Sequence, residues 1–198
     1  MSIRAAKKKS KGGRPADRTG KKAVSPSEGP IQTAAHVTEA VASPPFPVVG
    51  VGASAGGLEA FTALLKALPD DTGLAFVLVQ HMDPAHESAL SQILSRATEM
   101  PVDEITDGIA VKPNHVYVIP SNADITIRDG ILRLAERLEI AGRHLPIDRF
   151  LGSLAEDRKS AAIGVILSGT GSDGTHGLKA IKAEGGVTCK SIIFNASE

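Results

Sequence analysis

The chain repeats one arrangement that constrains its fold more than any other feature: a short aliphatic run, a loop and a segment with helical spacing. The aliphatic runs are Pro47–Gly52, Leu74–Val79 and Ala161–Leu167, and helical spacing follows the first two at Leu58–Leu68 and Glu87–Ala97. Short runs that are almost entirely apolar are typical of strands buried on both faces, as in a parallel sheet. Their alternation with helices predicts an α/β fold, with a doubly wound, mainly parallel sheet of Rossmann-like type.

The middle of the chain departs from this alternation. His115–Pro120 has the composition of a strand, and apolar residues flank the turn dipeptide Asp129-Gly130. An Asp-Gly pair between two apolar runs is a strong hairpin signal. We therefore expect an antiparallel hairpin insertion, followed by helices over Ile147–Lys159 and Gly174–Ala183.

Charge divides the chain into two parts. Residues 1–45 carry nine Lys or Arg against three Asp or Glu, whereas the remainder carries 13 against 19. The first part is rich in Lys, Ser, Pro and Gly and has little to bury, which predicts a disordered basic tail before a folded domain over residues 46–198. Two interpretations of the tail are open, a solvated segment and a patch for nucleic acid or acidic lipid, and the sequence favours the first.

Composition narrows the classes of function. Aromatic residues make up 3% of the chain, with no Trp, so no nucleic-acid partner that depends on base stacking is expected. Cys189 is the single cysteine, which excludes an intramolecular disulfide and fits a reducing, cytoplasmic location. No run of 18 apolar residues occurs, so no membrane insertion is expected.

The loop Gly52–Gly57 contains the pattern G-x-S-x-G between a strand and a helix. A nucleophile elbow requires that context, because small neighbours permit the sharp turn that exposes the Ser54 hydroxyl. The start of the next helix would offer N–H groups to a developing oxyanion. A dinucleotide-binding loop is the alternative, but it needs Gly where Ala55 stands, and an acidic residue where the second strand ends in Gln80-His81.

His81 directly follows the second aliphatic run. A serine hydroxyl is a weak nucleophile that needs a base, and neighbouring parallel strands end at the same edge of a sheet. A lone histidine at a strand end is more often a surface residue. The place of His81 beside the candidate elbow of Ser54 makes it the candidate base.

Asp173 ends the third loop, Ser168–Gly174, whose glycines let backbone approach closely. One interpretation is an N-cap of the following helix. The other is the acid of a triad, which orients His81 and stabilises its imidazolium, and both roles can coexist. The order Ser54, His81, Asp173 matches none of the three familiar triad orders, which predicts a different scaffold.

The other candidates are weaker. His36, His86, His115 and His176 share no metal-ligand spacing with a cysteine or an acidic cluster, so no metal is expected. Cys189 is interpreted as a small buried residue or a feature of the chain end rather than as a nucleophile.

These loops form part of a wider set of motifs: Val49–Gly57, Val79–Met82, Ala110–Pro120, Arg143–Asp148 and Gly164–Gly174. In this order they resemble the catalytic domain of chemotaxis protein-glutamate methylesterases of the CheB type. The resemblance covers roughly Val48–Val187. It is closest to the form of the domain that is fused to a methyltransferase and sensory modules.

The resemblance implies a doubly wound domain that uses a Ser-His-Asp site and no cofactor. The implied activity is hydrolysis of glutamyl 5-O-methyl esters on bacterial chemoreceptors with release of methanol, often with deamidation of receptor glutamines. Ser54 maps to the nucleophile, His81 to the base and Asp173 to the acid, and the backbone around Thr170 maps near the oxyanion. Implied partners are methylated chemoreceptors or similar signalling proteins, and a methyltransferase or sensory module.

The chain also departs from the family pattern. Residues 1–45 stand where stand-alone members carry a receiver domain, and the family continues well beyond Val187. We therefore expect an incomplete C-terminal end. The alternative function is a catalytically impaired fragment or receptor-binding module of the same family.

Overall fold

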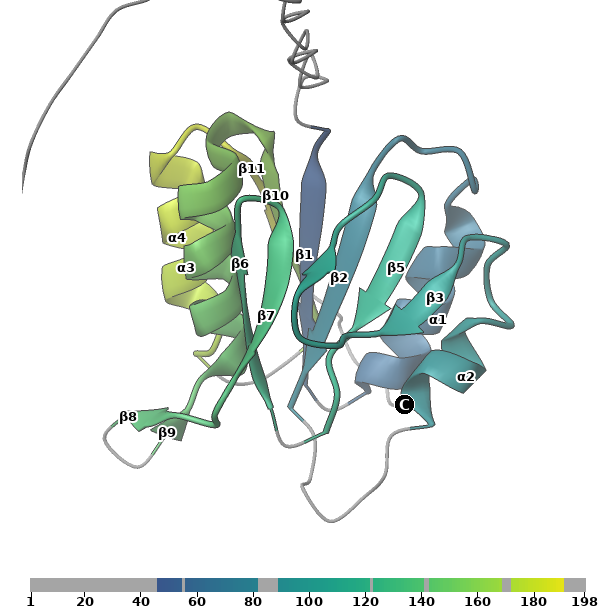
Figure 1. Cartoon of the computed structure of the whole chain (residues 1–198), viewed down its shortest axis with the longest axis horizontal. Coiled ribbons are helices and arrows are strands. Elements are labelled where there is room, and N and C mark those ends of the chain that lie inside the picture. The colour runs from purple at the N-terminus through teal and green to yellow at the C-terminus, as the bar shows by residue number, and fades with distance from the viewer. Residues whose placement is uncertain are drawn as a thin grey trace, which may run out of the picture. The chain divides into compact units, whose positions relative to one another are not determined.

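The computed structural model describes residues 46–54, 56–81, 89–121, 123–140, 143–168 and 172–190, all within one compact unit (Figure 1). The predicted tail over residues 1–45 and the end over residues 191–198 lie outside the described residues. The predicted division of the chain therefore stays a prediction. No helix in the described part is long and apolar enough to cross a membrane.

A six-stranded sheet forms the centre of the domain. Its strands, in spatial order, are β11 (Val187–Lys190), β10 (Ala162–Ser168), β1 (Val48–Ala53), β2 (Ala75–Gln80), β5 (His115–Val118) and β3 (Val102–Glu104). Every neighbouring pair is parallel, as predicted. The chain builds one half outward from β1 and then returns to build β10 and β11 on the other side. Open parallel sheets place their sites at the carboxyl ends of the strands beside such a reversal.

Helices cover both faces of this sheet, which confirms the doubly wound arrangement (Figure 1). They are α1 (Gly57–Ala67), α2 (Leu90–Leu94), α3 (Pro146–Arg158) and α4 (Thr175–Ala183), with a 3₁₀ turn η1 at Lys159–Ala161. Successive residues of β1 point to opposite faces. Val49 and Val51 pack with Phe61 of α1, whereas Val48 packs in the cluster that contains Phe150 of α3.

The antiparallel insertion lies on the α3 side of the sheet. Its three strands, in spatial order, are β4 (Ile109–Ala110), β7 (Ile131–Ala135) and β6 (Asp124–Arg128). The turn between β6 and β7 has φ values of 52° at Asp129 and 72° at Gly130, the left-handed pair that an Asp-Gly hairpin turn requires. The predicted hairpin is confirmed. A second antiparallel pair, β8 (Glu139–Ile140) and β9 (Arg143–His144), leads into α3.

The observed helices follow the predicted ranges closely, with one difference. Helix α3 begins with Pro146 in its first turn, where the missing N–H of proline has no intrahelical partner to lose. Helix α2 ends at Leu94, before the predicted end at Ala97, because the chain turns there and Ala97 N donates to Leu94 O. The predicted start of this helix at Glu87 lies outside the described residues.

Candidate active site

Ser54 and His81 follow the carboxyl ends of two neighbouring strands, in register with each other. Strands β1 and β2 pair with Ala53 opposite Gln80, so the next residue of each strand is the first beyond the carboxyl edge. Adjacent strands lie about 4.8 Å apart. The backbones of the predicted nucleophile and base are therefore about one strand spacing apart, at the lower edge of the sheet in Figure 1.

Ser54 lies in a tight turn between β1 and α1. Its carbonyl oxygen accepts a hydrogen bond from Gly57 N at 3.0 Å, and Gly56 has a φ of 76°, a conformation that favours glycine. Helix α1 begins at Gly57, so its unpaired N–H groups and positive dipole end lie at this edge. This strand–turn–helix context is the one predicted for a nucleophile elbow.

His81 pairs with Asp173. The distance from His81 Nε2 to Asp173 Oδ2 is 2.6 Å, and the two side chains are 39% and 8% exposed. An ionised carboxylate only accepts hydrogen bonds, so Nε2 donates and Nδ1 is the ring nitrogen left for Ser54. Between the described side chains, no hydrogen bond joins Ser54 to His81. Catalytic hydrogen bonds are often long before substrate binds.

Backbone donors hold the Asp173 carboxylate as well. Oδ1 accepts from Asp148 N at 2.8 Å and from Gly174 N at 2.9 Å, and Oδ2 accepts from Ile147 N at 3.1 Å. Burial alone would raise the pKa of Asp173, but the hydrogen bonds from His81 and from the backbone outweigh it and lower the pKa. Asp173 is therefore a fixed, ionised acceptor for His81.

These bonds correct one interpretation of Asp173. Its carboxylate caps α3, whose N-cap residue Leu145 makes no side-chain cap bond, rather than the helix that follows it. The N-cap residue of α4 is Gly174, again without a side-chain cap bond. In return, Asp148 Oδ1 of α3 accepts from Gly177 N of α4 at 2.8 Å. Each helix start is thus held by a carboxylate from the neighbouring segment.

Gly52 lets α3 reach this position. A Cβ at Gly52 would lie 2.5 Å from Ile147 Cγ2, and a Cβ at Gly174 would lie 3.0 Å from the same atom. The two glycines make room for Ile147 between the end of β1 and the start of α4. Because Ile147 N and the next N–H bind Asp173, this close packing also sets where the carboxylate stands.

A second histidine–carboxylate pair lies beside the first. His144 Nε2 is 2.6 Å from Asp124 Oδ1, and the side chains are 14% and 1% exposed. The His144 and His81 rings have centroids 6.0 Å apart and planes inclined by 48°. The edge of the sheet therefore carries two imidazoles, each held through Nε2 by a carboxylate.

Asp124 has further donors in the insertion and in α3. Its Oδ2 accepts from Arg149 Nη1 at 2.6 Å and from Leu138 N at 3.0 Å. Burial would raise the pKa of Asp124, but the hydrogen bonds from His144, Leu138 and Arg149 lower it overall. Asp124 is ionised and paired, as a buried carboxylate must be.

A pocket of about 330 Å³ adjoins this second pair. The residues that line it come from the insertion and from the starts of α3 and α4: Asp124, Leu138, Leu145, Asp148, Arg149 and His176. Nearby, Arg143 Nη2 donates to Ser172 Oγ at 2.6 Å, which ties β9 to the residue before Asp173. Within the described ranges, no group of three or more His, Cys, Asp or Glu residues is arranged to hold a metal ion.

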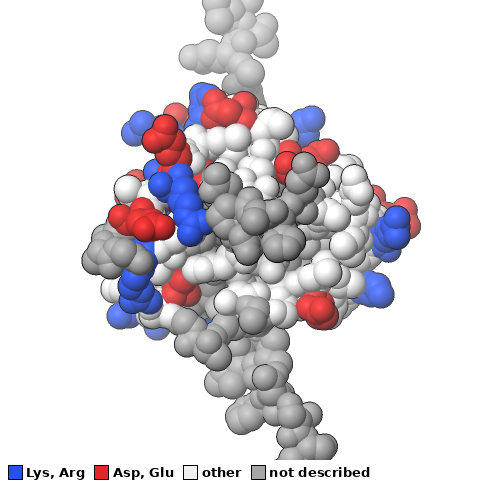
Figure 2. All heavy atoms as spheres, turned by 90° about the horizontal axis from the view of Figure 1, so that it is seen from below, with Lys and Arg blue, Asp and Glu red and all other residues white. Residues whose placement is uncertain are grey.

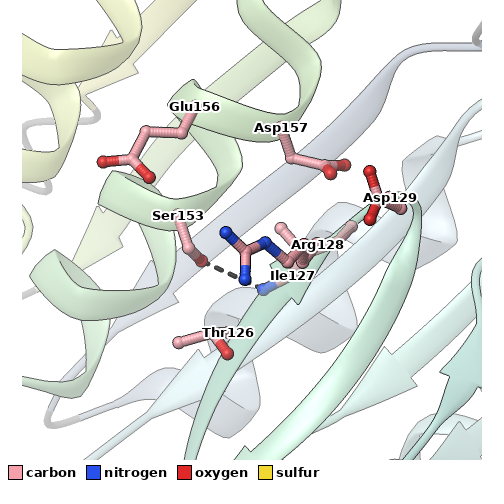
Figure 3. A pocket seen from close by; sticks show the side chains of 7 residues that line it. All are labelled: Thr126, Ile127, Arg128, Asp129, Ser153, Glu156 and Asp157. Atoms are coloured by element: carbon pink, nitrogen blue, oxygen red, sulfur yellow. Dashed lines mark hydrogen bonds between the residues drawn. The ribbon is translucent and has the colours of Figure 1, made fainter.

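Another pocket, of about 440 Å³, lies further along the contact between β6 and α3. Figure 3 shows the side chains that line it: Thr126, Ile127, Arg128, Asp129, Ser153, Glu156 and Asp157. Ser153 Oγ accepts a hydrogen bond from Ile127 N at 3.1 Å, which joins α3 to β6 at this pocket. None of these residues belongs to either histidine–carboxylate pair, so this pocket is separate from the candidate active site.

The described residues on the face that carries the candidate site form no large field of one charge. Seen from below, its Lys, Arg, Asp and Glu side chains lie mainly towards the periphery, and both signs intermingle on the side of β8 and β9 (Figure 2). A neutral group such as an ester is compatible with such a surface.

The sequence profile described as CheB methylesterase matches residues 49–191. The chain belongs to the CheB methylesterase family. It is 38% identical over 143 residues to protein-glutamate methylesterase/protein-glutamine glutaminase 2 of Burkholderia pseudomallei (strain 1710b), covering 72% of this chain and 42% of that protein. It is 34% identical over 151 residues to a protein-glutamate methylesterase of Myxococcus xanthus, covering 76% and 45%. The chain thus spans less than half the length of these curated relatives.

A solved CheB structure has the same fold. The crystal structure of the Thermotoga maritima CheB methylesterase catalytic domain matches with a TM-score of 0.65 and 33% identity, over 73% of this chain and 78% of that one. The predicted family and the predicted fold, a mainly parallel sheet with an antiparallel insertion, are both confirmed.

The sites predicted for this CheB domain are only partly brought together. His81 and Asp173 are in contact and Ser54 stands at the adjacent strand end, whereas Thr170 lies outside the described residues. The roles of all four residues stay predictions. Sequence reasoning missed Asp124, and it used His144 only as a mark of the family. No local signal joins these two residues, which lie 20 positions apart.

The remaining histidines and the cysteine can now be placed. His115 Nδ1 lies 3.0 Å from Pro113 O, and its ring stacks on Tyr117, a structural environment at the opposite edge of the sheet. His176 lines the smaller pocket, while His36 and His86 lie outside the described residues. Cys189 is exposed on β11, so its interpretation as a buried residue is wrong.

Proposed function

We propose that this CheB domain hydrolyses glutamyl 5-O-methyl esters on bacterial chemoreceptors, with Ser54 as the nucleophile, His81 as the base and Asp173 as the acid. The observation that carries the proposal is the His81–Asp173 pair at the strand end directly beside Ser54. The names of the relatives, which include methylesterase and glutaminase, support the same chemistry. Methylated chemoreceptors in the cytoplasm are the proposed partners, with a methyltransferase or sensory module as a further one.

In the first half of the proposed reaction, Ser54 Oγ attacks the carbonyl carbon of the methyl ester while its proton moves to His81 Nδ1. The imidazolium is stabilised by Asp173, which keeps its own negative charge. The tetrahedral intermediate then breaks its bond to the methoxy oxygen. His81 returns the proton to that oxygen, and methanol leaves an acyl group on Ser54.

In the second half, water replaces the alcohol. His81 Nδ1 takes a proton from water as the oxygen attacks the acyl carbon, and the bond to Ser54 Oγ breaks as the proton returns to it. The products are the free enzyme and the glutamic acid side chain, which releases its proton to water and becomes the carboxylate. N–H groups at the start of α1 and around Thr170 are the proposed donors to the oxyanion in both halves.

The decisive test is methanol release from a methylated receptor fragment. Replacing Ser54 with Ala is expected to remove activity by a factor of about 10³ or more, because only binding and oxyanion contributions remain. Ser95→Ala is the matched control, since Ser95 is an exposed serine whose hydroxyl donates to Gln92 O in the α2 segment. Ser54→Ala protein that releases methanol at the rate of the Ser95→Ala control would contradict the proposed nucleophile.

Two other functions are distinguished in the same assay. Ammonia release from a receptor fragment with glutamine at the methylation site would show the glutaminase activity that the relatives' names include. Binding of the methylated fragment with no methanol release from the unaltered chain would favour the catalytically impaired, receptor-binding alternative. The dinucleotide-binding alternative is disfavoured by the family to which the chain belongs.

A further inference from the structure

We propose that His144, held by the buried carboxylate of Asp124, is a positioning residue for the catalytic base His81. The inference rests on the proposed function of His81, and it adds a second imidazole to the working site. His144 is not assigned a contact with Ser54 or with the reacting atoms. It acts by limiting where the His81 ring can stand.

His144 is held in a fixed position by a buried carboxylate. Its Nε2 donates to Asp124 Oδ1 at 2.6 Å, and the other carboxylate oxygen is held by Arg149 Nη1 at 2.6 Å and Leu138 N at 3.0 Å. Rotation of the His144 ring would remove one donor from a carboxylate that is 1% exposed. Leaving a buried charge short of a partner is strongly unfavourable.

His81 needs a neighbour that restricts the position of its ring. Its side chain is 39% exposed, and among the described residues its one side-chain hydrogen bond runs from Nε2 to Asp173. One hydrogen bond to a carboxylate leaves the ring able to swing about the bonded nitrogen. Transfer of a proton from Ser54 needs the other ring nitrogen in a narrow range of positions, and a misplacement of about 1 Å costs on the order of 10²-fold in rate.

The rings of His144 and His81 lie against each other. Their centroids lie 6.0 Å apart with an inclination of 48°, within the range of tilted aromatic pairs. His144 therefore closes one side of the space that the His81 ring can occupy. Asp124, which is held between β6 and α3, fixes His144, and His144 in turn restricts the ring of the catalytic base.

A purely structural role for His144 makes different demands on its side chain. If it served only to pair Asp124 and anchor β9, any residue that donates to the carboxylate would replace it. If its ring positions His81, a flat ring is needed even without the hydrogen bond. His144→Gln keeps a donor and removes the ring, whereas His144→Phe keeps a ring and removes the donor.

The experiment measures these two variants and His144→Ala by three readouts. The first is kcat and KM for methanol release from a methylated receptor fragment, and the second is the thermal midpoint of unfolding. The third is the rate at which a fluorophosphonate labels Ser54, forming the Oγ–P bond and releasing fluoride. Labelling needs the base but no receptor. His115→Phe is the matched control, because His115 stacks on Tyr117 at the opposite edge of the sheet.

We expect His144→Ala and His144→Gln to lower kcat and the labelling rate about tenfold with little change in KM, and His144→Phe to restore most of both. His144→Gln should lower kcat and the labelling rate without lowering the thermal midpoint of unfolding. His144→Ala and His144→Phe should lower that midpoint. Full activity in His144→Gln, or a labelling rate in all three variants equal to that of the control, would overturn the proposal. If no protein releases methanol but labelling follows the expected pattern, the methylesterase proposal fails and the positioning role of His144 stands.

Discussion

The two histidine–carboxylate pairs are alike in bonding and unlike in surroundings. Each joins Nε2 to a carboxylate oxygen at 2.6 Å. His81 is 39% exposed, and its carboxylate is completed by backbone N–H groups, whereas His144 is 14% exposed and its carboxylate is completed by a guanidinium and one N–H. The comparison teaches that the pair itself does not define a catalytic base. In the proposed function, access to Ser54 at the adjacent strand end and to solvent is what would make the His81–Asp173 pair reactive, whereas the more enclosed His144–Asp124 pair would only support it.

The sharpest way to break this comparison is to neutralise each carboxylate in turn. Asp173→Asn is expected to lower kcat by about 10³-fold, because the amide can place a donor against His81 Nε2 and favour the wrong tautomer. Asp124→Asn should lower kcat by only about tenfold, since it acts through His144. Methanol release under saturating substrate measures both. Equal losses in the two variants would mean that the pairs are not functionally different.

Acid unfolding measures how much the two carboxylates, Asp124 and Asp173, contribute to the stability of the fold. The pKa of Asp124 and that of Asp173 are lowered in the fold, so the unfolded chain binds protons first as pH falls. Their stabilisation is therefore complete above the unfolded pKa of about 3.9 and is lost as pH falls through the lower folded values. Asp124→Asn should lower the free energy of unfolding by about 2–3 kcal/mol at neutral pH.

The control for this prediction is the slope of the same measurement. Urea unfolding between about pH 5 and pH 2 should show a shallower loss of stability in Asp124→Asn than in the unaltered protein, because one titrating group is gone. Parallel curves for the two proteins would contradict the assignment of Asp124 as a paired, ionised carboxylate.

The smallest expected effect concerns α3, the helix that both pairs share. Gly152 lies inside α3, and a Cβ there would meet no atom within 4 Å. Gly152→Ala should therefore raise the free energy of unfolding by about 0.5–1 kcal/mol, because alanine loses less backbone entropy in a helix. Both pairs should keep their geometry, so kcat should not change. Gly52→Ala is the contrasting variant: its Cβ would lie 2.5 Å from Ile147 Cγ2, and it should destabilise the fold.

Much of the fold could be read from short-range patterns. Continuous aliphatic runs predicted β1, β2 and β10, and leucines at helical spacing predicted α1. The Asp129-Gly130 dipeptide predicted its hairpin because only a few residues adopt two successive left-handed conformations. The loop around Ser54 was equally local, since a G-x-S-x-G turn needs only its own residues and the helix that follows.

Contacts between residues far apart in the chain could not be predicted from these short-range patterns. His81 could be nominated from its place after β2, but its carboxylate partner lies 92 positions away. The interpretation of Asp173 as a cap of the next helix failed because two of its donors, Ile147 N and Asp148 N, belong to a helix start that lies 26 and 25 positions earlier in the chain. No periodicity in a sequence predicts a contact between residues so far apart.

The sequence by itself determined most of the elements, the mainly parallel character of the central sheet and the residues that follow the carboxyl ends of its strands, because strand and helix periods and turn conformations are local properties. The tertiary structure alone decided that α3 would begin against Gly52 and that Asp173 would cap α3. It also decided that Asp124 would be buried with a hydrogen bond from His144. Those outcomes depend on how closely packed layers can approach and on which buried charges find donors when they do.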